Sequence, residues 1–129
     1  MECTIIRLKN ATSRADWLLY NEEERDKYLN DPHIPAQITA SLMYELLSGM
    51  INCVSKKAKT ASLAPVYILS GSDDAVSEYG KNIKTTVNLM TKQGFNIKDI
   101  VIFNNMRHDI LHEKDNIKVL DYIYEAITH

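Results

Sequence analysis

Residues 65–70 have the sequence PVYILS, a short apolar run that begins with a proline and is followed by a glycine. Residues 99–103 have the sequence DIVIF, a second run of the same kind. Continuous runs rich in β-branched residues predict strands that are buried on both faces, as in parallel sheets. Between them, residues 77–93 place apolar side chains three and four positions apart, which predicts a connecting helix. A strand, a helix and a second strand in this order predict a parallel crossover in an α/β layer.

Three further helices are expected around this layer. Asn21 and Glu24 form a capping arrangement that predicts a helix over residues 21–29. Residues 37–54 carry a wide apolar stripe at helical spacing, and residues 113–128 form the last helix. The inward face of the last helix is expected to hold Ile117, Leu120, Ile123, Tyr124 and Ile127. Two strands make a poor sheet with open edges, which suggests that part of a larger fold is missing.

The composition is that of an ordinary globular domain, with 129 residues, 45% hydrophobic and 25% charged. A net charge of -2, with no basic cluster larger than the three lysines of residues 56–59, argues against a nucleic-acid partner. No apolar run approaches the ~20 residues that a bilayer requires, and the first residues lack the pattern of a secretory signal. Cys3 and Cys53 have no metal or redox spacing, and no histidines and carboxylates form a convincing metal site. We therefore expect a cytoplasmic protein without a cofactor.

Polar side chains follow both predicted strands. Asp74 lies in the loop after the first strand, and His108 lies 34 positions later, in the loop after the second. Because the carboxyl ends of parallel strands share one edge of a sheet, these side chains are able to meet there. A carboxylate in that position holds an imidazole in one tautomer while the imidazole acts as a general base. Spacing alone leaves a structural interpretation open, in which Asp73 and Asp74 cap the next helix and His108 is a surface residue.

The stretch from Pro65 to Ile127 resembles the C-terminal end of α/β-hydrolases, in the group of monoacylglycerol lipases, lysophospholipases and serine aminopeptidase-like hydrolases. In that group the penultimate core strand ends in G-x-x-D-x-V, and its Asp is the acid of the catalytic triad. Residues 71–76, GSDDAV, fit this motif and place the acid at Asp74. The last strand of the group leads into a loop of the type R-H-E-x-x-N-E, whose His is the base. Residues 107–113, RHDILHE, fit that loop and place the base at His108.

The resemblance extends more loosely to the region of the cap over the pocket, so that it covers residues 16–127. It implies a helical cap or lid segment at residues 1–60 and the C-terminal part of the hydrolase core at residues 61–129. Ala75 stands where the group usually has a proline. Asn104 and Asn105 replace glycines that often precede the Arg-His pair, and because Asn tolerates left-handed geometry, we expect that turn to be kept.

A nucleophile is missing from this pattern. An α/β-hydrolase needs a serine on a G-x-S-x-G elbow and backbone donors for the oxyanion. No two of the four glycines frame a serine at that spacing, and Ser70 and Ser72 lie on the loop of the acid without an elbow. The expected fold is therefore a partial α/β-hydrolase: the cap, the last two parallel strands and their helices. We expect the isolated chain to have no significant esterase activity.

Two interpretations of function follow. In the first, the chain is the C-terminal portion of a serine hydrolase that acts on ester bonds of small-molecule or lipid substrates. His108 is then the base, Asp74 orients it, and the apolar stripe from Leu42 to Met50 helps to bind an acyl chain. In the second, the chain is a self-standing, non-catalytic α/β module that binds a partner or associates with itself through its open sheet edges.

Overall fold

The computed structural model describes residues 11–34, 38–53 and 64–128. Its elements follow in the order α1 (Glu22–Asn30), α2 (Ala40–Cys53), β1 (Pro65–Gly71), α3 (Ile83–Lys92), β2 (Asn96–Phe103) and α4 (Ile117–Thr128). The two strands pair in parallel, with Gly71 at the end of β1 opposite Phe103 at the end of β2. The loops that follow both strands therefore leave the sheet at the same edge.

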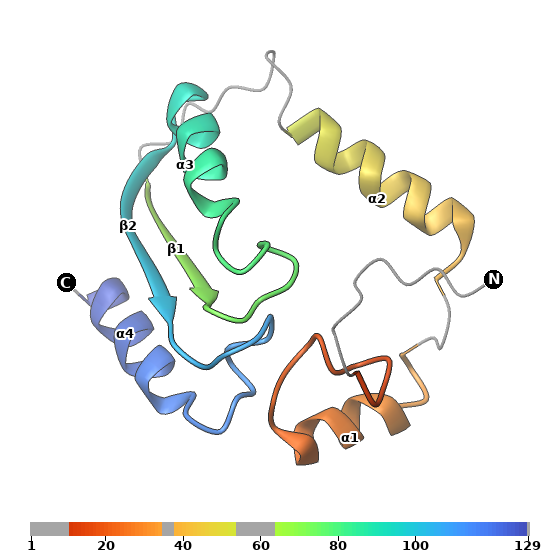
Figure 1. Cartoon of the computed structure of the whole chain (residues 1–129). Coiled ribbons are helices and arrows are strands. Elements are labelled where there is room, and N and C mark those ends of the chain that lie inside the picture. The colour runs from red at the N-terminus through yellow and green to blue at the C-terminus, as the bar shows by residue number, and fades with distance from the viewer. Residues whose placement is uncertain (1–10, 35–37, 54–63, 129) are drawn as a thin grey trace.

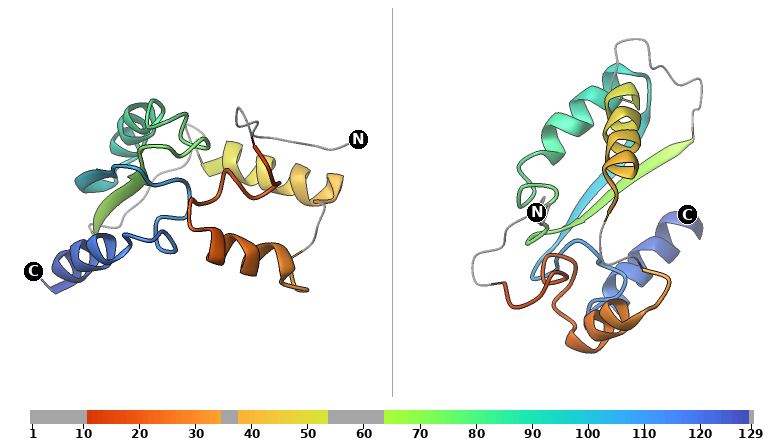
Figure 2. Two further views of the ribbon diagram at one scale, coloured as in Figure 1. Left: turned by 60° about the horizontal axis from the view of Figure 1, so that its bottom comes forward. Right: turned by 90° about the vertical axis from the view of Figure 1, so that its right-hand side faces the viewer.

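Helices α3 and α4 lie on opposite faces of the two-stranded sheet, while α1 and α2 lie to one side of this layer (Figure 1, Figure 2). The core under α4 is centred on Phe103, Met106 and Val119. Partly buried side chains packed against it are Leu69, Val101, Ile110, Tyr122 and Ile123. The α/β class and the partial α/β-hydrolase arrangement predicted from the sequence are confirmed, with two parallel strands and their helices in the expected order.

The inward face predicted for the last helix is wrong for four of its five residues. Ile117, Leu120, Tyr124 and Ile127 are between 44% and 77% exposed, and only Ile123 packs against the core. The helix instead buries Val119 completely. The physical reason is the width of the sheet: two strands cover only a narrow part of the apolar surface of α4.

The helix before β2 is shorter than predicted. It begins at Ile83 rather than near position 77, because Glu78, Tyr79 and Gly80 all have positive φ angles, between 51° and 80°. Consecutive left-handed residues cannot belong to an α-helix. The last helix likewise begins at Ile117 rather than at position 113.

One local prediction at a turn is confirmed, and another is wrong. Asn105 has a φ of 56°, the left-handed geometry expected of this turn, and Gly94, which follows α3, has a φ of 92°. The capping arrangement of Asn21 does not form, because its side-chain amide donates to the carbonyl oxygen of His112 at 3.0 Å. A tertiary contact has replaced the local one.

Several predicted features lie outside the described residues: Cys3, the lysines of residues 56–59 and the boundary between residues 60 and 61. No helix in the described part of the chain is long and apolar enough to cross a lipid bilayer.

Gly71 provides a test of the strand pairing. A Cβ atom added there would overlap the carbonyl oxygens of Met106 and Arg107, which are backbone atoms and cannot swing away. Gly71→Ala should therefore lower the free energy of unfolding by about 1–3 kcal/mol, measured by urea denaturation. Gly49→Ala is the matched control, because nothing lies within 4 Å of a Cβ added there. Equal effects of the two substitutions would contradict the close approach of the two loops.

Candidate functional site

The candidate site lies where the loops after β1 and β2 meet. The Ser72 N–H donates to the carbonyl oxygen of Phe103 at 2.9 Å, and the Asp73 N–H donates to that of Met106 at 2.9 Å. The Asn105 N–H donates to the Ser72 hydroxyl at 3.0 Å. These bonds extend the parallel pairing beyond the sheet and hold the two loops side by side.

The structure brings the two predicted site residues together. Asp74 Oδ1 lies 3.1 Å from His108 Nδ1, although the residues are 34 positions apart in the chain. The Asp74 side chain is 9% exposed, while that of His108 is 41% exposed. Asp74 Oδ1 also accepts the Val76 N–H at 2.8 Å, which fixes the carboxylate in place. A buried acid thus holds one nitrogen of a ring that solvent and other molecules can reach.

The left-handed turn after Asp74 fixes the backbone of this acid through hydrogen bonds. The Asp74 carbonyl oxygen accepts the Tyr79 N–H at 2.8 Å and the Ser77 hydroxyl at 3.0 Å. The Ser77 hydroxyl in turn accepts the Gly80 N–H at 3.0 Å. The residues that the periodicity placed in a helix therefore form a compact loop around the acid.

The imidazole of His108 also contacts a segment distant in sequence. The ring of Trp17 lies with its centroid 5.3 Å from that of His108, at an interplanar angle of 42°. The Asp109 N–H donates to the carbonyl oxygen of Leu18 at 2.8 Å. Residues 16–21, which precede α1, therefore form one wall of the site.

Glu113 is a structural residue of the site whose role the sequence did not reveal. It is 4% exposed, and its carboxylate accepts N–H groups from two segments of backbone. Oε1 accepts the Arg107 N–H at 3.0 Å, and both oxygens accept the Tyr20 N–H, at 2.9 and 3.0 Å. Oε2 also accepts the Asn21 N–H at 3.2 Å. Its only sequence signal is its position as the final Glu of the loop motif that begins at Arg107.

Arg107 and Tyr20 continue this connection through their side chains. The Arg107 guanidinium lies 3.9 Å from the centroid of the Tyr20 ring and donates to the carbonyl oxygen of Asp16. The Tyr20 hydroxyl donates to Asp73 Oδ2 at 2.7 Å, and this bond raises the pKa of Tyr20 above its ordinary value. The wall formed by residues 16–21 therefore contacts both loops, one beside the acid and one beside the base.

Asp16 organises the start of this wall. Its carboxylate accepts the Thr12 N–H and hydroxyl and the Ser13 hydroxyl, and it lies 3.6 Å from Arg25 Nε. Burial opposes ionisation of Asp16, but the hydrogen bonds from Ser13 and Thr12 outweigh it and lower the pKa to about 2.

A second His–Asp pair lies on the same loop. His112 Nδ1 is 2.9 Å from both carboxylate oxygens of Asp109, and this hydrogen bond raises the pKa of His112. The pair borders a small hollow of about 190 Å³ between the loop and residues 18–31. In this second pair, Asp109 is only three residues from His112 on the same loop. Asp74 and His108, in contrast, follow the ends of two different strands.

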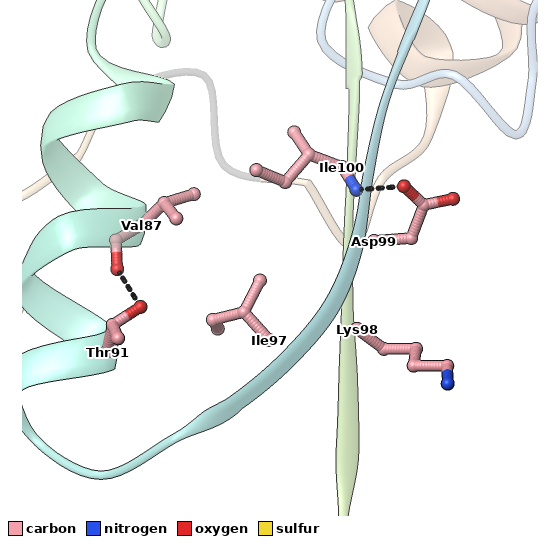
Figure 3. A pocket seen from close by; sticks show the side chains of 6 residues that line it. All are labelled: Val87, Thr91, Ile97, Lys98, Asp99 and Ile100. Carbon is pink, nitrogen blue, oxygen red and sulfur yellow. Dashed lines mark hydrogen bonds between the residues drawn. The ribbon is translucent and has the colours of Figure 1, made fainter.

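Another hollow lies away from this site. It has a volume of about 500 Å³ and lies between α3 and β2 (Figure 3). Its lining residues are Val87, Thr91, Ile97, Lys98, Asp99 and Ile100. These lining residues include none of the residues predicted for the site. Among the residues that the structure describes, no three metal-binding side chains form a cluster.

The Asp74–His108 pair is equipped to move a proton. With Nδ1 facing Asp74, the other nitrogen of the ring is left to accept a proton from a reacting group. The nearby hydroxyls are engaged elsewhere: Ser70 donates to the carbonyl oxygen of Gly71 and Ser72 donates to Asp73 Oδ1. The described residues of the site therefore supply an acid and a base.

Comparison with known proteins gives one family and several similar solved structures, among them a carboxyl esterase and a monoacylglycerol lipase. The profile of a family described as serine aminopeptidase, S33, matches residues 4–115. A thermostable carboxyl esterase from Bacillus coagulans, solved with glycerol, is similar at 19% identity with a TM-score of 0.70, covering 94% of this chain and 39% of its own. A monoacylglycerol lipase from Paleococcus ferrophilus is similar at 22% identity with a TM-score of 0.66, covering 92% of this chain and 44% of its own. The chain thus spans less than half the length of either structure. No curated protein matches the sequence.

Asp16 should make the free energy of unfolding depend on pH. Its pKa of about 2 lies below the ordinary 3.8, so folding favours the ionised form. The stabilisation is present above pH 3.8 and is lost as the pH falls through about 2, on the order of 2 kcal/mol in total. Asp16→Asn should lower the free energy of unfolding at neutral pH and flatten its decline in that acidic range, measured by urea denaturation at each pH. Asp26→Asn, on the exposed side of α1, is the control and should retain the wild-type decline. An unchanged decline in Asp16→Asn would refute this role.

Proposed function

Since the chain belongs to the serine aminopeptidase S33 family, we propose that it supplies the acid and the base of a Ser–Asp–His triad in a serine hydrolase. The single observation that carries this proposal is the 3.1 Å contact between the buried Asp74 carboxylate and the accessible His108 ring. His108 is the general base, and Asp74 holds its tautomer and stabilises the imidazolium that forms.

The nucleophile comes from a segment with a G-x-S-x-G elbow, which this sequence does not contain. As the serine attacks the carbonyl carbon of the substrate, its proton passes to Nε2 of His108. The same proton then passes to the leaving group when the tetrahedral intermediate collapses, and water later releases the acyl group by the reverse sequence. Without the serine and its oxyanion donors, the pair of residues in this chain has nothing to activate.

Exposed apolar surface supports association of this chain with further polypeptide. Ile100 and Ile102 of β2 are 41% and 45% exposed, and one face of α4 is also exposed. Burial of a large apolar side chain contributes about 1.5–3 kcal/mol, so these surfaces stabilise any complex that covers them. The carboxyl esterase and the monoacylglycerol lipase with similar folds are each more than twice as long as the stretch that matches.

We propose carboxylic esters with an apolar acyl chain as the substrates of the complete enzyme. The proteins with similar folds are described as a carboxyl esterase and a monoacylglycerol lipase. Helix α2 exposes apolar side chains that suit contact with an acyl chain, among them Leu42, Leu46, Leu47 and Met50.

Exposed apolar surface also favours the second function, a non-catalytic module that associates with itself. In that case the isolated chain should form dimers or larger species across micromolar concentrations, measured by sedimentation velocity. Substitution of Ile117 and Ile127 by Lys, which removes two exposed apolar side chains of α4, should then shift the chain toward monomer. A monomer at every concentration would exclude this alternative.

The catalytic proposal predicts that the isolated chain is inactive and that hydrolysis appears once the serine segment is supplied. The isolated chain should not hydrolyse a 4-nitrophenyl ester measurably. When it is joined to, or coexpressed with, the G-x-S-x-G segment encoded upstream of it, hydrolysis should appear. His108→Ala or Asp74→Asn should then lower kcat by about 10⁴-fold.

The second His–Asp pair offers matched controls on the same loop. His112→Ala and Asp109→Asn should leave most of the activity in place, because neither side chain contacts Asp74 or His108 in the described structure. Equal losses from both pairs, or hydrolysis by the isolated chain that disappears in His108→Ala, would sink the proposal. So would an upstream region that encodes no serine elbow.

A further inference from the structure

We propose that Glu113 is the positioning residue for His108: its carboxylate binds the loop of the base to residues 16–21 and thereby sets the orientation of the imidazole. This inference rests on the proposed function, because it assigns the residue that keeps the base of the triad in place. Glu113 has no direct contact with His108, so its action passes through the backbone.

The first half of the connection is on the loop of the base. Glu113 Oε1 accepts the N–H of Arg107, the residue immediately before His108, at 3.0 Å. The N–H of Asp109, the residue immediately after it, donates to the carbonyl oxygen of Leu18 at 2.8 Å. The backbone is therefore held on both sides of the imidazole.

The second half of the connection is on the segment that carries Trp17. The same carboxylate accepts the N–H groups of Tyr20 and Asn21 at 2.9–3.2 Å. This anchors the segment three residues after Trp17, whose ring packs against that of His108. One buried side chain thus places both the base and the aromatic ring beside it.

Only a carboxylate can make all of these bonds. Three backbone N–H groups converge on Glu113, and its two oxygens are both acceptors. A glutamine at this position has one acceptor oxygen, and its NH₂ group would face N–H donors. Because the site is 4% exposed, water cannot replace the lost acceptor without opening the wall.

The test uses Glu113→Gln in the isolated chain, with nitrogen NMR of the imidazole rings and proton cross-peaks between Trp17 and His108. The wild-type chain should show one neutral tautomer, with the proton on Nδ1 facing Asp74, and clear cross-peaks between the two rings. Glu113→Gln should show a mixture of the two tautomers and should lose the cross-peaks. Trp17 is the one tryptophan of the sequence, so its signals are unambiguous.

Asp115→Asn is the matched control, because Asp115 lies two residues after Glu113 and its side chain is 81% exposed. This substitution also removes one negative charge. It should leave both signatures unchanged. One tautomer with intact cross-peaks in Glu113→Gln would overturn the inference.

A second measurement needs no variant and covers the case in which Glu113→Gln does not fold. In the wild-type chain, the amide protons of Tyr20, Asn21 and Arg107 should exchange with water far more slowly than exposed loop amides. Rapid exchange at Arg107 with a fixed His108 tautomer would also overturn the inference. Neither of these measurements depends on enzymatic activity. If the hydrolysis assay contradicts the proposed function, the NMR and exchange results still test the role of Glu113 separately.

Discussion

Parallel pairing of β1 with β2 is the constraint on which the rest of this structure depends. Its register places Gly71 opposite Phe103, so both strands end at the same level of the sheet. Gly71 is needed there because the backbone of Met106 and Arg107 approaches where a Cβ would lie. The close approach allows the loops to exchange backbone hydrogen bonds. A carboxylate and an imidazole 34 positions apart thereby come within 3.1 Å.

Two buried carboxylates hold the wall of the site, residues 16–21, in place. Asp16 gathers donors from the segment before α1, and Glu113 gathers backbone N–H groups from that segment and from the loop of the base. A buried charge is costly unless hydrogen bonds satisfy it, and both carboxylates are satisfied by several donors. Replacing either carboxylate by an apolar residue would leave several donors without an acceptor, so both groups fix the orientation of the segments that they join. This suits a site in which the direction of one imidazole matters.

Many apolar side chains of α2 and α4 are less completely buried than the polar groups of the site. The core under α4 is small, and helix α2 contains no buried residue. Four apolar side chains on α4 remain exposed, and each forgoes part of the roughly 1.5–3 kcal/mol that full burial of such a side chain contributes. The polar site is therefore well formed, while apolar side chains of α2 and α4 remain exposed. This combination agrees with a chain that spans less than half of the solved structures sharing its fold.

Continuous apolar runs were enough to predict both strands and their parallel pairing, because a strand buried on two faces leaves a local signature. The family motifs pointed to Asp74 and His108, and the four glycines of the sequence excluded a serine elbow. The late start of α3, the failed cap at Asn21 and the exposed face of α4 could not be predicted in this way. Each depends on what lies opposite in space: a turn folded around Asp74, a carbonyl oxygen of His112 and a sheet only two strands wide. Glu113 belongs with these, because its partners lie up to 93 positions away and periodicity records only neighbours along the chain.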